Sequence, residues 1–271
     1  MLHVTDLSVK YNASDEVYAL REVGFSIQAG EHVALIGANG AGKSTLLLAL
    51  CGILAAVSGR VTVEDTVLEK KTLRALRQKA GMVFQNPDDQ LFMPTLYEDV
   101  AFGLRNYGFA EDKIESKMDN VLEWLGISHL KNRMSHKLSG GEKRLAALAG
   151  VLVMEPSVLL MDEPSSFLDP RARRRLIEVL NRLPQTMLIA THDLDMALDL
   201  CHRVIVLKEG HVWADAPAKS ALRDASLLEE CGLELPLSLS GGFLPRSISV
   251  ASSGGYDQHY CQCQEDSSAR N

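Results

Sequence analysis

Residues 32–50 read His32-Val33-Ala34-Leu35-Ile36-Gly37-Ala38-Asn39-Gly40-Ala41-Gly42-Lys43-Ser44-Thr45-Leu46-Leu47-Leu48-Ala49-Leu50. The stretch begins with a short, mostly apolar run, continues with a glycine-rich segment, and ends in a leucine-rich run. A short apolar run before glycines is typical of a buried strand, and the leucine-rich run favours a helix. The predicted order is therefore strand, loop and helix.

The loop from Gly37 to Ser44 matches the pattern G-x-x-x-x-G-K-[ST], which binds nucleotide phosphates. Glycines let the backbone curl around a phosphate chain with its N–H groups pointing inward. The helix that follows adds the positive end of its dipole. We expect Lys43 to reach the β- and γ-phosphates and Ser44 to offer its hydroxyl to Mg²⁺. Thr45 is expected to make a lesser phosphate contact.

The rest of the chain alternates strand-like and helical patterns. Period-2 alternation at residues 2–9 and 23–27 predicts strands near the N-terminus. Apolar runs that predict buried strands follow at residues 82–84, 158–161, 187–190 and 204–207. Because helical patterns fall between these runs, we predict an α/β fold with a largely parallel sheet.

One domain of residues 1–235, with a helical segment inserted at about residues 94–154, accounts for most of the chain. From Pro236 onward there are 8 Ser and 4 Gly among 36 residues, which predicts a flexible tail over residues 236–271. The tail carries His259, Cys261 and Cys263. One imidazole and two thiols are too few for a closed metal site, so we expect an ordinary flexible end.

Composition excludes several classes of protein. With 271 residues, 46% hydrophobic and 23% charged, the chain is neither disordered nor fibrous over most of its length. A net charge of −7 disfavours binding of nucleic acid by charge alone. We find no signal peptide and no apolar run near the roughly 18 residues of a membrane span. Five scattered cysteines do not form a disulfide framework. We therefore expect a protein made in the reducing cytosol.

Two carboxylates follow one of the predicted buried strands. The run 158–161 leads directly into Asp162 and Glu163. Asp162 lies where the end of a strand would aim a carboxylate at Mg²⁺ beside the phosphate-binding loop. Glu163, one residue on, is a candidate general base that polarises the attacking water.

A second glycine-rich segment, Leu138-Ser139-Gly140-Gly141-Glu142, precedes an apolar-patterned helix. A serine and two glycines at the start of a helix form a cap that can bind an anion. On these residues alone, an ordinary N-cap explains the segment equally well.

Taken in order, these motifs make residues 1–215 resemble the ATP-binding cassette (ABC) ATPases, the motor subunits of ABC transporters. The resemblance implies a P-loop NTPase (RecA-like) core with a mostly parallel sheet, an N-terminal antiparallel β portion and an inserted helical subdomain. It implies that Tyr11 stacks on adenine. It also implies that Gln85 contacts Mg²⁺ and the attacking water and senses a membrane partner.

The resemblance extends to the second glycine-rich segment. Ser139-Gly140-Gly141 is similar to the family's LSGGQ motif, with Glu142 in place of the glutamine. Residues 165–169, ending in Asp169, resemble the loop that crosses between subunits, with Phe167 less usual there. His192 resembles the histidine that holds the γ-phosphate.

These likenesses imply an ATPase that works as a pair. ATP and Mg²⁺ would bind at the phosphate loop, and water would attack the γ-phosphate to give ADP and phosphate. The Ser139 cap would close over the nucleotide of a second cassette, so that two ATP molecules lie in a head-to-tail dimer. The sequence leaves open whether the second cassette is identical or different.

Two segments resemble the energy-coupling-factor (ECF) type importers: residues 84–92 and 149–156. In that group a membrane scaffold subunit and a substrate-binding membrane subunit complete the transporter, and the cassette lies at the cytoplasmic face of the membrane. Asp88 and Asp89 are expected to pair with basic residues of the scaffold. Residues 191–195 and 214–217 resemble the cobalt or nickel systems.

Three alternatives remain open from the sequence. The cargo of an ECF or other ABC importer can be a vitamin or another small solute. The chain can hold ATP as a switch without turnover, although Glu163 and His192 are both present. A non-transport ABC ATPase of DNA repair or translation is a third reading. Such proteins usually carry a long coiled coil or two cassettes per chain, and this chain has one phosphate loop.

Overall fold

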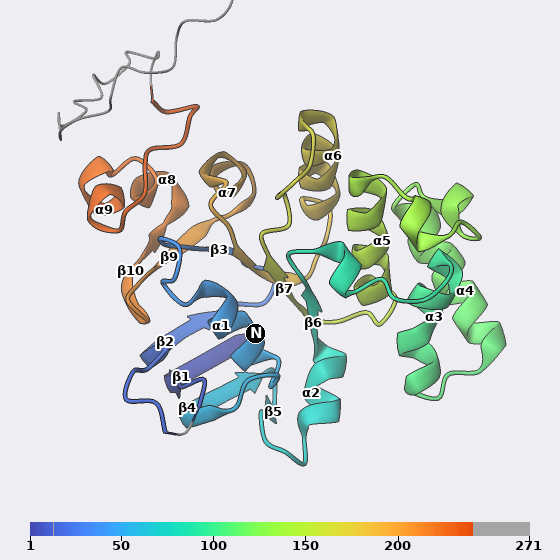
Figure 1. The fold of residues 1–271 in the computed structure, drawn as a ribbon, viewed down its shortest axis with the longest axis horizontal. Helices are drawn as coiled ribbons and strands as arrows, with labels where there is room; N and C mark the ends of the chain where they lie inside the picture. Colours follow the sequence, from blue (N-terminus) through green and yellow to red (C-terminus); the bar gives the residue numbers. More distant parts are fainter. Residues whose placement is uncertain (13, 241–271) are drawn as a thin grey trace, which may run out of the picture. The chain divides into compact units, whose positions relative to one another are not determined.

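Two β-sheets organise the part of the chain that the computed structural model describes, residues 1–12 and 14–240 (Figure 1). The larger sheet has the strand order β10 (His211–Pro217), β9 (Arg203–Lys208), β3 (His32–Ile36), β8 (Thr186–Ala190), β7 (Val158–Asp162) and β6 (Ala80–Val83). Its neighbouring strands are parallel except for β10 and β9. The smaller, antiparallel sheet has the order β2 (Leu20–Ile27), β1 (Leu2–Val9), β4 (Ala56–Val63) and β5 (Thr66–Val67). The predicted α/β fold, with its N-terminal antiparallel portion, is confirmed.

Helix α1 (Lys43–Leu50) follows the glycine-rich loop and lies between the two sheets. The core around it contains side chains from β1, β2 and β4 of one sheet and from β3, β7, β8 and β9 of the other. Val33 and Leu35 of β3 face this core, whereas Ala34 and Ile36 face a second core on the opposite side, as the period of a strand requires. The helices that contribute to that second core include α5 (Gly140–Leu152), α6 (Pro170–Leu180) and α7 (Leu194–Leu200).

The inserted helical segment lies between β6 and β7 in the chain and contains α3 (Leu96–Asn106), α4 (Glu111–Trp124) and α5, with short 3₁₀ turns η1 (Pro87–Asp89), η2 (Ser128–Leu130) and η3 (Ser135–Lys137). Figure 1 shows the three helices side by side at the edge of the larger sheet. Helix α4 buries Ile114, Met118 and Leu122, four residues apart, so one stripe of the helix faces its neighbours. This insertion agrees with the fold class predicted from the sequence.

Some elements were not predicted from the sequence. Strand β4 has five exposed residues and a central glycine, and β10 is an edge strand without a fully buried residue. Neither presents the apolar run on which the strand predictions rested. Short helices complete the described chain: α2 (Leu73–Lys79), α8 (Ala218–Ala221) and α9 (Ala225–Glu230).

The described chain ends in a short segment that contacts α7. The backbone N–H groups of Leu237 and Ser238 each donate to the Asp195 carboxylate at 3.0 Å. The remainder of the tail proposed for residues 236–271, with His259, Cys261 and Cys263, lies outside the described residues.

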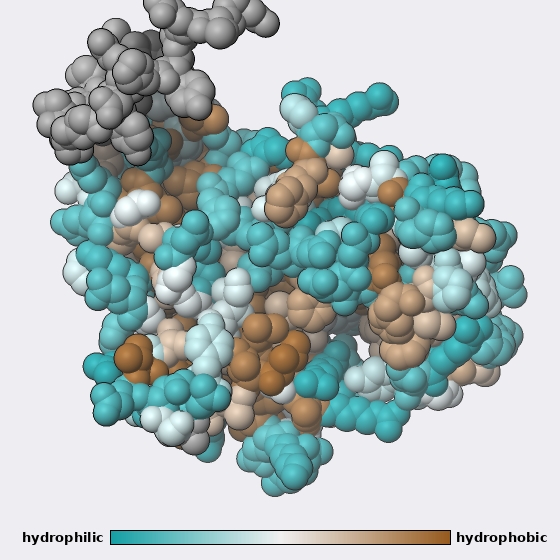
Figure 2. Space-filling view, in the orientation of Figure 1, coloured by the Kyte–Doolittle hydropathy of each residue, from teal (hydrophilic) through white to brown (hydrophobic). Residues whose placement is uncertain are grey.

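Within residues 1–12 and 14–240, no helix combines the length and apolar character that crossing a bilayer requires. Figure 2 shows a mostly hydrophilic face, with an apolar patch between the positions of α1 and α2.

Candidate functional site

Glycines shape the loop between β3 and α1 where a side chain could not fit. A Cβ on Gly37 (φ 151°) would lie 2.2 Å from the carbonyl oxygen of Leu207 on β9. A Cβ on Gly42 (φ 105°) would lie 3.0 Å from the carbonyl oxygen of Ala19. The loop therefore packs closely against two other segments, and its path depends on the absence of side chains at both positions.

Lys43 is almost fully buried at the start of α1, with 7% of its surface exposed. Its Nζ donates to the carbonyl oxygens of Gly37 at 2.7 Å and Ala38 at 3.2 Å, so the ammonium group lies inside the curled loop. Burial lowers the pKa of Lys43, and the carboxylates of Glu163 and Asp162 oppose that effect. A cation enclosed by loop carbonyls and facing two carboxylates is placed to bind a phosphate chain.

The loop opens into a cavity of about 570 Å³, large enough for a nucleotide. The predicted site residues that line it are Tyr11, Asn39, Gly40, Gly42, Lys43, Ser44, Thr45, Gln85, Glu163 and His192. The structure thus brings together groups that lie far apart in the sequence. The sequence reasoning missed the other lining residues, which are Val17, Tyr18, Ala19, Glu209 and Gly210. No local motif marks these five, because they reach the cavity only through the pairing of distant segments.

Tyr11 lies at the open side of the cavity with 65% of its surface exposed. Its hydroxyl lies 2.6 Å from the Thr45 hydroxyl on α1, and this hydrogen bond fixes the far end of the ring. An exposed aromatic ring held next to a phosphate-binding loop is suited to stacking on a base.

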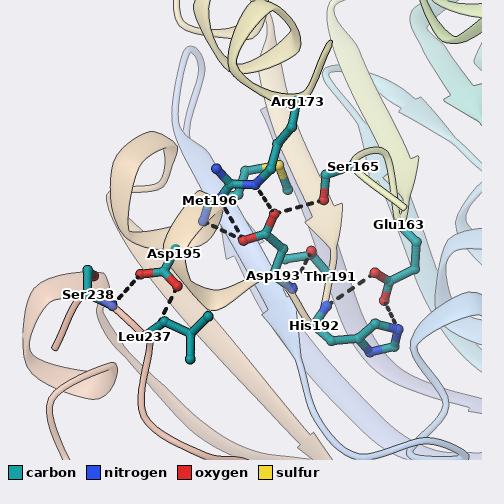
Figure 3. Close-up of polar contacts among 10 residues, drawn as sticks. All are labelled: Glu163, Ser165, Arg173, Thr191, His192, Asp193, Asp195, Met196, Leu237 and Ser238. Carbon is teal, nitrogen blue, oxygen red and sulfur yellow. Dashed lines mark hydrogen bonds and ion pairs between the residues drawn. The ribbon is translucent and has the colours of Figure 1, made fainter. Parts of the chain in front are cut away.

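Glu163 and His192 meet at the ends of the adjacent parallel strands β7 and β8 (Figure 3). The His192 backbone N–H donates to Glu163 Oε2 at 3.2 Å, and His192 Nε2 lies 2.9 Å from Oε1. Burial raises the pKa of Glu163 to about 7. Burial, followed by the charge of Lys43, lowers the pKa of His192. The contact therefore joins the His192 imidazole to a carboxyl group that can exchange a proton near neutral pH.

Asp162 ends strand β7 with only 6% of its surface exposed. Among the described residues, its Oδ1 is buried and has no hydrogen-bond partner. A buried carboxylate oxygen without a donor is costly unless another group, such as a cation, compensates it. Together with the Ser44 hydroxyl in the cavity, this donor set is all oxygen, which is what Mg²⁺ prefers. The residues present therefore fit a magnesium ion.

The remaining predicted residues lie away from this cavity. Ser139 is the N-cap of α5, where it forms a capping box with Glu142, whose Oε2 accepts from the Ser139 N–H at 2.7 Å and from the hydroxyl at 2.8 Å. Asp169 is the N-cap of α6 and accepts from the N–H groups of Arg171 and Ala172 at 2.9 and 3.0 Å. None of Ser139, Gly140, Gly141 and Asp169 lines the cavity around Lys43.

Comparison with known proteins identifies the family. A model described as ABC transporter matches residues 20–166. The chain belongs to the ABC transporter ATP-binding family. A putative ABC transporter ATP-binding protein of Geobacter sulfurreducens is 48% identical over 89% of this chain and 96% of its own length. The energy-coupling factor transporter ATP-binding protein EcfA of Methanothermobacter thermautotrophicus is 43% identical over 87% of this chain and 77% of its own length.

Solved ABC cassettes share the fold. CbiO1 of Clostridium perfringens, part of the ABC transporter complex cbiONQ, has a TM-score of 0.75 and 40% identity, and the match covers 84% of this chain and 93% of CbiO1. The dimeric cassette MJ0796, in a post-hydrolysis state with ADP and Pi, has a TM-score of 0.72 and 26% identity, with 80% of this chain and 99% of MJ0796 covered. The cassette described here is thus an ATP-binding, ATP-hydrolysing transporter motor.

Arg144, a buried arginine, holds the loop that carries Gln85. The sequence patterns did not predict this role. Arg144 of α5 is 2% exposed and donates to the carbonyl oxygens of Phe84 at 2.7 Å and Gln85 at 2.6 Å. Burial lowers the pKa of Arg144 to about 10, so the guanidinium stays charged at neutral pH. The helix that begins at Ser139 and the loop that carries Gln85 are therefore joined by two hydrogen bonds.

Asp88 and Asp89 each have a partner within the chain. Asp88 Oδ1 lies 2.6 Å from the Lys143 ammonium of the same chain, so a basic group of its own cassette already occupies it. Asp89 Oδ1 accepts from the Asn86 side chain at 3.4 Å. Asp88 remains 58% exposed in this ion pair, so its pairing with a scaffold subunit stays a prediction.

Proposed function

We propose that this cassette is the motor subunit of an ECF-type importer, attached to the cytoplasmic face of the cell membrane through a scaffold subunit and a substrate-binding subunit. The similarity to EcfA proteins over most of the chain carries this proposal, at 43% and 41% identity in two organisms. CbiO1, described as part of the cbiONQ complex, supports the same assignment. No role in binding nucleic acid is proposed.

For the cargo, we propose a transition-metal ion, cobalt or nickel. The support is the resemblance of residues 191–195 and 214–217 to the cobalt or nickel systems, since a cassette does not itself touch the cargo. Uptake of a vitamin or another small solute is the alternative. A role in DNA repair or translation is less well supported, because the matching relatives are named as transporter subunits.

At the nucleotide, the loop from Gly37 to Thr45 would wrap the phosphate chain and Tyr11 would stack on adenine. Lys43 would neutralise charge on the β- and γ-phosphates. Its position inside the loop, 2.7 Å from the Gly37 carbonyl oxygen, supports this role because a phosphate could replace the carbonyl as its partner.

Ser44, Gln85 and Asp162 would hold Mg²⁺. The buried, unpartnered Asp162 Oδ1 supports this assignment among the described residues. When bound, the ion would supply neutralisation of the charge that develops on the phosphate oxygens.

Glu163 would act as the base that orients and deprotonates the attacking water, since its pKa of about 7 lies close to the operating pH. His192 would hold the γ-phosphate, and its contact with Glu163 would keep both groups on the same side of the cavity. The proton of the water would pass to Glu163 as the oxygen attacks phosphorus and the bond to the β-phosphate oxygen breaks.

We propose further that Ser139, Gly140, Gly141 and Asp169 serve the nucleotide of a second cassette, identical or related. These four residues do not line the cavity of their own chain, and they lie at the starts of α5 and α6, where the helix dipole favours an anion. The dimeric state of MJ0796 supports a paired arrangement.

The decisive experiment for transport is purification of the tagged cassette from its native membranes, identification of bound membrane proteins, and reconstitution of the complex in liposomes. We expect ATP-dependent uptake of radiolabelled cobalt or nickel ions that a Lys43→Ala cassette does not support. Uptake of a labelled vitamin and not of metal ions would favour the alternative cargo. Purification without any membrane partner would contradict the proposed function.

A further inference from the structure

Asp193 lies next to His192 and contacts three other segments (Figure 3). Arg173 of α6 binds both carboxylate oxygens, with Nε 2.5 Å from Oδ2 and Nη2 2.7 Å from Oδ1. The Ser165 hydroxyl donates to Oδ2 at 3.0 Å, and the Met196 N–H donates to Oδ1 at 2.9 Å. Each carboxylate oxygen thus accepts two hydrogen bonds, which fixes the side chain in one orientation.

These contacts join the two loops that carry the reacting groups. Ser165 is two residues beyond Glu163, and Asp193 is one residue beyond His192. Arg173 reaches the same carboxylate from α6, the helix that begins after the loop ending in Asp169. The carboxylate of Asp193 therefore ties the loop after β7 to the loop after β8, and it does not line the cavity that contains Lys43.

Capping of a helix alone does not account for this arrangement. As the N-cap of α7, Asp193 needs only the hydrogen bond from Met196. The bidentate arginine and the serine hydroxyl are additional, and they come from the segment that carries Glu163. Burial would raise the pKa of Asp193, but Arg173 and the Met196 N–H outweigh it and lower the pKa, so the carboxylate stays charged.

We propose that Asp193, Arg173 and Ser165 form one positioning unit that fixes His192 against Glu163 for ATP hydrolysis. The inference rests on the proposed roles of Glu163 and His192. The unit acts through the backbone: Asp193 places the adjacent His192 N–H, which donates to Glu163 Oε2 at 3.2 Å, while Ser165 holds the other loop. None of the three residues lines the nucleotide cavity.

The test compares Arg173→Gln and Ser165→Ala with Asp195→Asn in the full-length chain. Asp195 is a suitable control because it is an acidic residue two positions after Asp193 whose carboxylate accepts from Leu237 and Ser238 and makes no hydrogen bond to Arg173 or Ser165. Steady-state MgATP hydrolysis gives kcat and KM, and binding of a non-hydrolysable ATP analogue gives Kd.

We expect Arg173→Gln to lower kcat about tenfold or more, and Ser165→Ala about threefold, because a small displacement of reacting groups is costly. KM and Kd should change less than about twofold, since the phosphate-binding loop is untouched. Arg173→Lys, which keeps the charge and one donor, should recover part of the loss. Asp195→Asn should retain the wild-type kcat.

Two results would overturn the positioning unit: kcat within about twofold of wild type for both Arg173→Gln and Ser165→Ala, or an equal loss in Asp195→Asn. If Arg173→Gln does not fold, Ser165→Ala decides, since it removes one hydroxyl. Glu163→Gln separates this failure from failure of the proposed function. Normal turnover of Glu163→Gln would refute the assignment of Glu163 as the base. If Glu163→Gln loses turnover while Ser165→Ala and Arg173→Gln keep it, only the positioning unit is refuted.

Discussion

His192 contacts both oxygens of the Glu163 carboxylate, through its backbone N–H at 3.2 Å and its Nε2 at 2.9 Å. The two residues follow neighbouring parallel strands, β7 and β8, at the carboxyl edge of the sheet where open α/β sheets place their ligands. Glu163 has a positive φ of 44° and is 4% exposed, so the turn after β7 holds the side chain almost fully buried at the wall of the cavity. A carboxyl group held there accepts a proton near neutral pH, which is what a base for water attack requires.

The raised pKa of Glu163 predicts a stability effect of pH. The folded, metal-free chain keeps this carboxyl protonated up to about pH 7, whereas the unfolded chain ionises it near 4.5. Stability is therefore lost as pH rises from 4.5 through 7 and stays lower above it. Glu163→Gln removes this penalty, so it should stabilise the chain at pH 8 by up to about 3 kcal/mol and much less at pH 5. Urea unfolding of the wild type and Glu163→Gln in EDTA, at pH 5 and pH 8, measures the difference in stability between the two chains. An equal difference at both pH values would contradict the prediction.

The close approach of Gly37 to β9 predicts that Gly37→Ala is poorly tolerated. The new Cβ would lie 2.2 Å from a backbone oxygen of Leu207, which cannot move without displacing the strand. We expect a loss of at least about 2 kcal/mol in the free energy of unfolding, together with loss of ATP binding. Gly150→Ala is the control. A Cβ at this position of α5 meets nothing within 4 Å, and the substitution should stabilise by about 0.5–1 kcal/mol. Similar unfolding curves for the two variants would refute the account of the loop.

The placement of Ser139 predicts an effect in trans. Ser139→Arg should abolish ATP hydrolysis while the isolated chain still binds ATP, because Ser139 does not line its own nucleotide cavity. His136→Arg introduces the same side chain at an exposed position three residues earlier and should leave turnover unchanged. ATPase assays and equilibrium binding of a labelled ATP analogue measure the two effects. Normal turnover of Ser139→Arg would contradict the proposed paired site.

Arg144 and Lys143 are neighbours whose substitutions should reduce stability by different amounts. Arg144→Lys cannot serve both the Phe84 and Gln85 carbonyl oxygens and would leave a buried acceptor unpaired, so it should destabilise by about 1–3 kcal/mol. Lys143→Met removes an ion pair to Asp88, which is 58% exposed, and should cost less than about 1 kcal/mol. Chemical unfolding at fixed pH compares them. A larger loss of unfolding free energy for Lys143→Met than for Arg144→Lys would show that the two hydrogen bonds of Arg144 contribute little.

Local patterns in the sequence predicted the parts of the site that are local in the chain. The glycine-rich loop, the strand before it and the helix after it depend on neighbouring residues, and so did the placement of Asp162 and Glu163 at the end of a strand. The motifs also led to His192, although its contact with Glu163 depends on how β7 and β8 pair.

Features that depend on tertiary packing were not visible in the sequence. Tyr18 and Glu209 reach the cavity wall from distant segments without any motif of their own. Arg144 is a residue type usually found at the surface, yet it is 2% exposed because two backbone carbonyls of the Gln85 loop receive it. The ion pair of Asp88 with Lys143, one turn into α5, likewise depends on tertiary packing, because the two residues lie 55 positions apart in the chain.

Turnover of Glu163→Gln tests the central claim most directly, since the proposed attack of water on the γ-phosphate requires that carboxylate as its base. The variant keeps the size of the side chain and the phosphate-binding loop, so ATP should bind within about threefold of the wild-type affinity and stabilise a closed dimer. Steady-state MgATP hydrolysis should fall by about 10²-fold or more, because the amide cannot accept the proton of the attacking water. Hydrolysis by Glu163→Gln at the wild-type rate, with normal ATP binding, would contradict the account.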